Sequence, residues 1–379
     1  MINGAGACQE RIVERRSWVR AGIVLSAMIL YNGESAQRAP SKRGPVERKR
    51  VGVVLFQLGG PDSLEAIEPF LYNLFSDPDI IDFPLARIAR QPLARLIAAN
   101  RAKKVRHHYA AICGRSPIRE LTRRQAEALE RELRAAFDAR VVVAMRYWHP
   151  LTEEAIRRLE AERVDELVLL PLYPQYSSTT TGSSLKEWNR RLQDGGRGLA
   201  RVPAHVIRHF YQHPGYLDSL VEGINNALKR FERPERVHLV FSAHNVPVSV
   251  IQAGDPYQAQ IESAVKLALE RGGWRLPSCL CYQSKVGGAR WLEPSLDQTI
   301  EELAAAGAGQ LLVVPIAFVS DHVETLSEIN IEAREKAGRC GVEQFEMMPG
   351  LNDSPTFIRA LAGLVEETLG ARSLTAAAR

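Results

Sequence analysis

The sequence predicts an α/β protein made of two doubly wound, Rossmann-like parallel-sheet lobes that face a cleft. Three observations support this fold class. From residue 51 onward, short runs of β-branched residues alternate with amphipathic stretches of ten or more residues, as expected of βα units. The β-type runs are apolar throughout, which is typical of parallel strands covered on both faces. A break at GGRGLARVP, near residue 200, separates two such series.

Each strand is predicted where an apolar, β-branched run is bounded by polar or turn residues. The runs are VGVVLFQ at 51–57, RVVVAMR at 140–146, ELVLLPL at 166–172, VHLVFS at 237–242, SCLCYQ at 278–283 and LLVVPIAF at 311–318. Apolar residues recur at helical spacing between them, and Glu153 and Glu154 suit the start of a helix near Thr152. The predicted helices span 63–75, 119–138, 152–161, 213–231, 257–271, 295–306, 323–337 and 355–369.

The chain divides into three parts by charge and pattern. Residues 1–50 form a basic extension, which we expect to be disordered, with ten Lys or Arg against four Glu. Its net charge of +6 leaves −1 of the total +5 for the body, so we expect no nucleic-acid partner. Residues 51–200 are the predicted N-terminal lobe and residues 201–379 the C-terminal lobe.

The cysteines and the apolar segments bear on the compartment. The apolar run at 21–31 has about half of the roughly 20 residues needed to cross a bilayer. The five cysteines include no CxxC pair, which indicates free thiols, and we interpret Cys279 and Cys281 as packing residues rather than metal ligands. We therefore expect a cytoplasmic protein, which could rest on the inner membrane as a peripheral protein. The sequence indicates no particular oligomeric state.

Ligands of an open α/β sheet bind outside the carboxyl ends of its strands, so the loops after the strands are the candidate sites. A nucleotide is the usual occupant, but the sequence has neither GxGxxG after a strand nor GxxxxGK[ST]. Gly59, Gly60 and Pro61 follow the first strand and make only a tight turn. The sequence therefore gives little support for a nucleotide-binding protein.

A histidine follows the strand at 237–242. His244 lies in FSAHNVP, at a carboxyl end that faces the cleft, and Pro247 discourages an immediate helix. Neutral imidazole at this place suits a general base or a metal ligand. A hydrogen-bonded structural histidine is the alternative.

An acidic stripe follows the strand at 311–318. Asp321 and His322 lie at the turn, and Glu324, Glu328 and Glu332 recur every fourth residue of the predicted helix. Oxygen ligands spaced along a path suit a divalent cation that is passed inward. A solvated helix face explains the same spacing, and from the spacing alone both interpretations stay open.

Several segments closely resemble motifs of the ferrochelatase family, in the family's order, from residue 51 to about 368. They are LGGPDS (58–63), CGRSPI (113–118), MRYWHPLTEEAI (145–156), YPQYSSTTTGSSL (173–185), FSAHNVP (241–247) with GDPY (254–257), CYQSKVGGARWLEP (281–294) and VVPIAFVSDHVETLSEINIE (313–332). The resemblance implies a chelatase-like fold and a lyase that inserts Fe²⁺ into protoporphyrin IX. The products would be protoheme and two protons, in the terminal step of heme biosynthesis.

The resemblance implies roles for the matching residues. His244 matches the histidine of the SAH motif and Glu324 the first glutamate of SDHxET, both assigned in the family to metal binding and to removal of pyrrole protons. Near a cation, Glu324 should have a lowered pKa and stay ionised. His322 would lie beside them, and Glu328 and Glu332 would continue the acidic path. Matches to porphyrin-binding positions are Leu58, Arg146, Tyr147, Trp291 and Phe318 at the ring and Arg101, Tyr109 and Ser116 at the propionates.

The resemblance also implies porphyrin and ferrous iron as partners, with iron as a substrate and no permanently bound cofactor. Some members hold a [2Fe–2S] cluster through C-terminal cysteines and one cysteine in the YPQYS segment. Here that segment has Ser178 and no cysteine follows Cys340, so we expect no iron–sulfur cluster. Asn245 stands where glycine or serine is usual, and Cys113 replaces a common glycine.

Three alternatives are weighed against this function. A porphyrin or heme carrier without catalysis would need the apolar slot, but not His244 opposite Glu324. A chelatase that loads cobalt into a less oxidised tetrapyrrole typically lacks the RY and YPQYSSTTTG segments. YPQYSSTTTGSS resembles the protoporphyrin-using branch more than the coproporphyrin-using branch, which leaves coproporphyrin as the alternative substrate.

Overall fold

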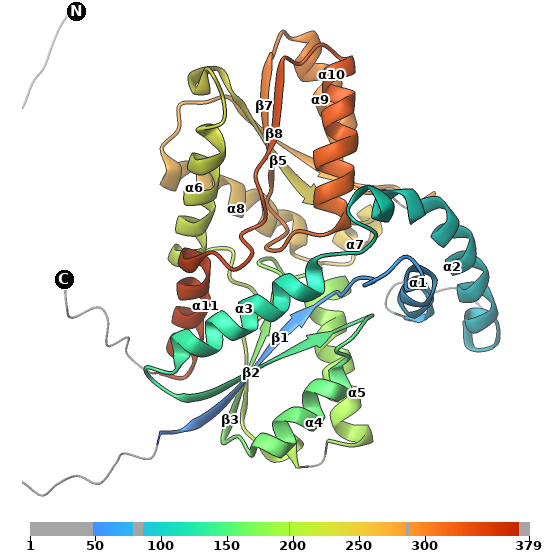
Figure 1. Ribbon diagram of the computed structural model, residues 1–379, viewed down its shortest axis with the longest axis vertical. Coiled ribbons are helices and arrows are strands. Elements are labelled where there is room, and N and C mark those ends of the chain that lie inside the picture. The colour runs from blue at the N-terminus through green and yellow to red at the C-terminus, as the bar shows by residue number, and fades with distance from the viewer. Residues whose placement is uncertain (1–47, 79–85, 197, 286–287, 371–379) are drawn as a thin grey trace, which may run out of the picture. The chain divides into compact units, whose positions relative to one another are not determined.

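The computed structural model describes residues 48–78, 86–196, 198–285 and 288–370, except the side chains of residues 86–89 (Figure 1). Most of the predicted basic extension, residues 1–47, therefore lies outside the described residues. Among the described residues, no helix combines the length and the apolarity that a membrane span requires.

The described residues contain two four-stranded parallel sheets, which confirms the predicted fold class. The first sheet has the order β2-β1-β3-β4, and the second has the order β6-β5-β7-β8. The strands are β1 (Arg50–Gln57), β2 (Asp138–Met145), β3 (Glu166–Pro171), β4 (Ala204–Val206), β5 (His238–His244), β6 (Ser278–Gln283), β7 (Gln310–Pro315) and β8 (Gln344–Met347). Each sheet winds outward in both directions from its first strand, so β1 and β5 mark the two topological switch points. Ligand crevices form outside the carboxyl ends of such strands.

Helices flank both sheets (Figure 1). The α-helices are α1 (Ile67–Ser76), α2 (Ala86–Ala111), α3 (Ile118–Leu133), α4 (Thr152–Glu162), α5 (Ser183–Asp194), α6 (Pro214–Leu228), α7 (Val248–Gln252), α8 (Tyr257–Gly272), α9 (Leu296–Ala305), α10 (Arg334–Arg339) and α11 (Pro355–Thr368). Two π-helices are η1 (Ser178–Gly182) and η4 (Glu324–Ala333), and two 3₁₀ turns are η2 (Leu199–Arg201) and η3 (Pro234–Arg236).

One large apolar core is shared by the two sheets. It includes Leu55 of β1 and Phe241 of β5, and α11 packs against both α3 and α6 (Figure 1). A smaller core under α4 and α5 holds Trp188, whose ring makes an edge contact with Phe56 at 5.6 Å. The sheets are thus held together by apolar packing as well as by the chain that links them. The lobe boundary near residue 200 stays a prediction, and β4 pairs with β3 in the first sheet.

Several elements differ from the predictions. The prediction missed α2, α5, α7, β4 and β8; β4 and β8 are short strands of three and four residues. The predicted α-helix over 323–337 is wrong in type, because its first part is the π-helix η4 and only its end is α-helical. Helical periodicity in a sequence does not separate these two forms. π-Helical turns are rare and are frequently found at functional sites.

Candidate active site

His244 is the last residue of β5, at the carboxyl end of the central strand of the second sheet. Its backbone is fixed: the Tyr257 hydroxyl donates to the His244 carbonyl at 2.9 Å, and the Asn245 N–H donates to the Gln283 carbonyl at 2.8 Å. Its imidazole is 39% exposed. A rigid strand end therefore presents a histidine side chain that a ligand can reach.

Asn245, a departure from the family's usual glycine or serine, has a structural role. Its buried side-chain amide donates to the Leu292 carbonyl at 3.0 Å and accepts from the Leu292 N–H at 2.9 Å. This pair of hydrogen bonds ties the loop after β5 to the segment that carries Trp291. Trp291 also forms an isolated β-bridge with Pro247.

Glu324, the first residue of η4, lies between two imidazoles. Its Oε2 atom is 3.6 Å from Nε2 of His244 and 3.6 Å from Nε2 of His322. These distances exceed a normal hydrogen bond, and this buried oxygen has no hydrogen-bond partner among the described residues. The imidazoles of His244 and His322 thus converge on one carboxylate oxygen of Glu324.

The electrostatics of this cluster favour an ionised glutamate. Burial opposes the charge, but the charges of His244 and His322 outweigh it and hold the pKa of Glu324 well below its usual range. The sequence prediction gave this direction with a cation as the cause; in the structure the two imidazoles produce it.

His322 is buried, with a fixed orientation. Its Nδ1–H donates to the Ser320 carbonyl at 3.1 Å, which turns Nε2 toward Glu324. Burial opposes protonation, but the contact with Glu324 and the Ser320 carbonyl outweigh it and raise the pKa of His322 above its usual value. The neighbouring carboxylate of Asp321 faces away from this cluster, since it accepts hydrogen bonds from Thr325, Gly350 and Asn352.

Apolar side chains border the cluster. The Phe318 ring makes edge contacts with His244 at 6.0 Å and with His322 at 4.3 Å between ring centroids. Leu58, directly after β1, belongs to an apolar group that also contains Tyr109 and Tyr147. The half-buried Trp291 has an indole N–H without a hydrogen-bond partner among the described residues. The carboxyl ends of both central strands thus carry apolar surface.

The acidic stripe changes from half-buried to exposed along η4. The side chain of Glu324 is 21% exposed and that of Glu332 is 48% exposed. Burial and the negative charge of Glu324 raise the pKa of Glu328 to about 7, and the Ser284 hydroxyl donates to Glu328 at 2.5 Å. The three glutamates therefore differ in environment, which a uniformly solvated helix face would not show.

Arg146 and Tyr147 follow β2 and share a buried acceptor. Oδ2 of Asp77 accepts from Nη2 of Arg146 at 2.6 Å, from the Tyr147 hydroxyl at 2.5 Å and from the Ser183 hydroxyl at 3.3 Å. Burial raises the pKa of Tyr147, so its phenol stays protonated. The second buried carboxylate, Glu187, lies 3.8 Å from Nη1 of Arg146. Sequence reasoning found the arginine and the tyrosine but missed Asp77, which no motif marked.

The three predicted propionate contacts lie in different surroundings. Tyr109 is buried in α2, and burial with the charges of Glu324 and Glu328 raises its pKa, which places it beside the acidic stripe. Ser116 is buried in the loop after α2, where its N–H donates to the Pro61 carbonyl at 2.8 Å. Arg101 is half-buried in α2, eight residues before Tyr109, or about 12 Å along the helix axis.

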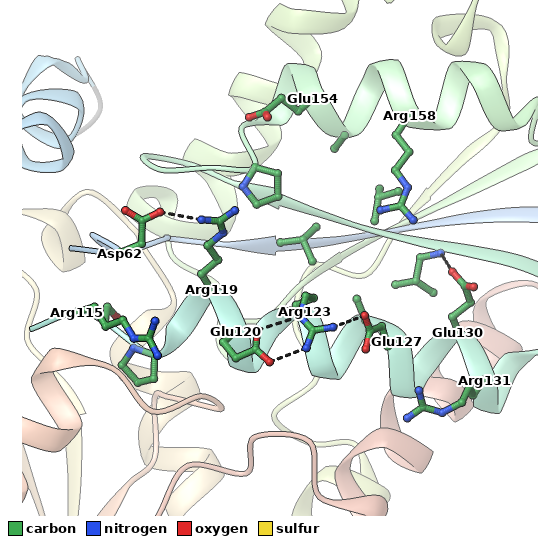
Figure 2. Close-up of a pocket in the computed structure, with 18 of the residues that line it drawn as sticks. Asp62, Arg115, Arg119, Glu120, Arg123, Glu127, Glu130, Arg131, Glu154 and Arg158 are labelled. Atoms are coloured by element: carbon green, nitrogen blue, oxygen red, sulfur yellow. Dashed lines mark hydrogen bonds and ion pairs between the residues drawn. The ribbon is translucent and has the colours of Figure 1, made fainter. Parts of the chain in front are cut away.

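A large cavity is lined by other residues, although Leu326 of η4 contributes to it. It has a volume of about 1080 Å³, runs along β2 between α3 and α4, and contains neither His244 nor Glu324 (Figure 2). Its charged lining is largely neutralised by ion pairs, such as Arg119 with Asp62 at 2.7 Å (Figure 2). We assign the candidate active site by the convergence of reactive groups and not by cavity size.

The comparisons with known proteins agree with this geometry. Residues 50–369 match the family model described as Ferrochelatase. The chain is 47% identical to ferrochelatase of Synechococcus elongatus over 322 residues, covering 84% of this chain and 83% of that protein. It is 47% identical to ferrochelatase of Trichodesmium erythraeum over 326 residues (86% and 84%) and to that of a Nostoc species over 322 residues (84% and 82%). The chain therefore belongs to the ferrochelatase family, the lyases that insert ferrous iron into a porphyrin.

Proposed function

We propose that this ferrochelatase uses protoporphyrin IX and that His244 and Glu324 carry out the metal insertion. The observation that supports these roles most strongly is the approach of two imidazole Nε2 atoms to one oxygen of Glu324, each at 3.6 Å. This cluster lies at the carboxyl end of β5, where doubly wound sheets bind their ligands. Iron and porphyrin are the substrates of the reaction.

The reaction needs a metal ligand and proton acceptors in one place. Fe²⁺ replaces two pyrrole protons of the free porphyrin, giving protoheme with an uncharged iron–macrocycle core and two released protons. A neutral imidazole of His244 accepts a proton or binds the ion, but not both at the same time. Glu324, which stays ionised, supplies negative charge for the incoming cation or takes the second proton. His322 positions Glu324 and acts only through it.

An apolar slot holds the ring against these groups. Phe318 contacts both histidine rings, Leu58 follows β1, and Trp291 lies in the segment between β6 and α9. Apolar walls exclude water, which strengthens the electrostatic interactions of Glu324 with the metal. Because Arg146 and Tyr147 are bound to Asp77, we assign them to a fixed wall of the slot.

We assign Glu328 and Glu332 to an acidic path for iron. The rise in exposure from Glu324 to Glu332 supports a route that begins at the surface. Arg101, Tyr109 and Ser116 stay our assignment for the propionates. The guanidinium of Arg101 carries the charge that complements a carboxylate, whereas Tyr109 lies beside the carboxylates of Glu324 and Glu328, which disfavour an anion there.

The absence of an iron–sulfur cluster stays part of this proposal. Ser178, at the position of the family's cluster cysteine, donates from both its N–H and its hydroxyl to Asp255, at 2.7 and 2.8 Å. This serine therefore has a structural function of its own. A cytoplasmic location, with peripheral contact to the membrane that delivers an apolar substrate, also stays a proposal and rests on composition.

The test is anaerobic insertion of Fe²⁺ into protoporphyrin and, separately, into coproporphyrin, followed through the change in the porphyrin absorption spectrum. We expect turnover with protoporphyrin at a higher kcat/KM than with coproporphyrin. Turnover with coproporphyrin alone would reject the proposed substrate and keep the enzyme class. Binding of porphyrin without turnover of either protoporphyrin or coproporphyrin would favour a carrier.

A further inference from the structure

Two adjacent histidines of α2 lie beside the outer end of the acidic stripe. His107 is exposed, His108 is half-buried, and both are near Glu332 of η4. One potential ligand atom from each of the three side chains lies within 4.8 Å of the other two. In the part of the chain that the structure describes, this is the one such group of three His, Cys, Asp or Glu side chains.

Hydrogen bonds preorganise this group. Nδ1 of His108 lies 2.5 Å from Oε1 of Glu332 and 3.0 Å from the buried Ser327 hydroxyl, which donates to Glu332 at 3.2 Å. The rings of His107 and His108 lie 3.9 Å apart between centroids, at 36°, so both face the same side of α2. Two elements far apart in the sequence thus bring their ligands to one point.

We infer that His107, His108 and Glu332 form a surface binding site for a divalent transition-metal ion, where iron is taken up before it enters the acidic path. The role in delivery rests on the proposed function; the binding itself does not. The hydrogen bond between His108 and Glu332 would be exchanged for bonds from each side chain to the ion.

The ligand set indicates the class of ion. Two imidazoles and one carboxylate suit Fe²⁺, Co²⁺ and Zn²⁺, whereas Mg²⁺ and Ca²⁺ prefer oxygen ligands alone. Three protein ligands leave positions for water, and open positions are typical of sites whose metal exchanges with other ligands. The exposure of His107 and Glu332 gives hydrated ions direct access.

The position fits uptake and transfer. Glu332 is the outermost member of the stripe, and Glu328 and Glu324 follow at intervals of four residues toward His244. An ion released from the histidines passes from the exposed Glu332 to Glu328 and Glu324, which are both half-buried. We place the selection of transition metals over alkaline-earth ions at this outer group, because it supplies nitrogen ligands before the ion reaches the porphyrin.

The test uses Co²⁺ binding, followed by absorption spectroscopy, in Glu324→Gln, a variant designed to weaken the inner cluster. The double substitution His107→Ala and His108→Ala is added to this variant, and His209→Ala, an exposed histidine elsewhere, is the matched control. We expect the double substitution to weaken Co²⁺ binding at least about tenfold, and the control to leave it unchanged. Equal Co²⁺ binding in all three proteins would overturn the site.

Kinetics then test delivery in the otherwise native enzyme. The double substitution should raise the KM for Fe²⁺ about tenfold and leave both kcat and the KM for porphyrin close to wild type. Glu332→Gln, which keeps both histidines, should also raise the KM for Fe²⁺. It provides an independent test if the double variant does not fold. An unchanged KM for Fe²⁺ in both variants refutes delivery. If the wild type shows no chelatase activity, the Co²⁺ experiment still decides whether the site exists.

Discussion

Asp77→Asn offers a sharp test of how the wall of the slot is held. The Asp77 side chain is 2% exposed, and one of its oxygens accepts from Arg146, Tyr147 and Ser183. Asparagine keeps the shape and one oxygen acceptor but removes the negative charge. Arg146, only 14% exposed, then loses its nearest counter-charge.

The size of the effect follows from these contacts. Breaking a buried ion pair by removing one partner costs about 3–5 kcal/mol when the other charge is left uncompensated. Here Glu187 remains 3.8 Å from Arg146, and asparagine still accepts neutral hydrogen bonds. We therefore expect the free energy of unfolding to fall by about 2–3 kcal/mol, and the Tm by roughly 4–6 °C.

The assay is urea unfolding followed by tryptophan fluorescence, with Asp138→Asn as the matched control. Asp138 also pairs with two arginines, Arg50 at 3.2 Å and Arg140 at 2.6 Å, but its side chain is 36% exposed. Exposed pairs contribute about 0–1 kcal/mol, so the control should change stability little. If Asp77→Asn costs no more than Asp138→Asn, the buried network does not hold the wall as we describe.

Three further predictions follow from individual side chains. The pKa of Glu328 is raised to about 7, so between about pH 4.5 and 7 the folded state keeps a proton that the unfolded state has lost, and Glu328 should lower the free energy of unfolding as pH rises through this range. Glu328→Gln should reduce this loss of stability by up to about 3 kcal/mol, measured by urea unfolding at several pH values. An equal loss in the variant and the wild type would argue against the raised pKa of Glu328. Asn245→Ala leaves the buried N–H and carbonyl of Leu292 without these partners and should lower the free energy of unfolding by about 2 kcal/mol in the same assay. An unchanged free energy of unfolding would show that these hydrogen bonds do not stabilise the loop after β5. Burial raises the pKa of the Cys281 thiol to about 12, so iodoacetamide at pH 8 should modify the exposed Cys113 in the folded protein and reach Cys281 only after unfolding, as peptide mass spectrometry can check.

The sequence predicted the two lobes because their central strands are long, apolar runs. β1 and β5 are buried on both faces, so the runs at 51–57 and 237–242 marked them without ambiguity. The short strands β4 and β8 carry too few residues to show a pattern. The rule that ligands bind at carboxyl ends of strands directed attention to His244, which the structure has as the last residue of β5; its role in the reaction stays a prediction.

The rest of the candidate site depends on contacts between distant segments. Asp77 meets Arg146 and Tyr147 only in the folded chain, and no local pattern identifies a buried acceptor of this kind. The pairing of His108 with Glu332 joins residues more than 200 positions apart in the sequence. From the spacing alone, a solvated helix face remained an alternative for the three glutamates. Burial now distinguishes Glu324, whose side chain is 21% exposed, from Glu332, whose side chain is 48% exposed.

The most direct test of the central claim is anaerobic Fe²⁺ insertion into protoporphyrin by wild type, His244→Ala and Glu324→Gln, with porphyrin binding measured on the same samples by fluorescence quenching. The controls His209→Ala and Glu302→Gln alter exposed residues outside the cluster. We predict that His244→Ala and Glu324→Gln each lower kcat at least about 100-fold, while all five proteins bind porphyrin with similar affinity. Near-wild-type turnover in either active-site variant would contradict the assignment of metal insertion to His244 and Glu324.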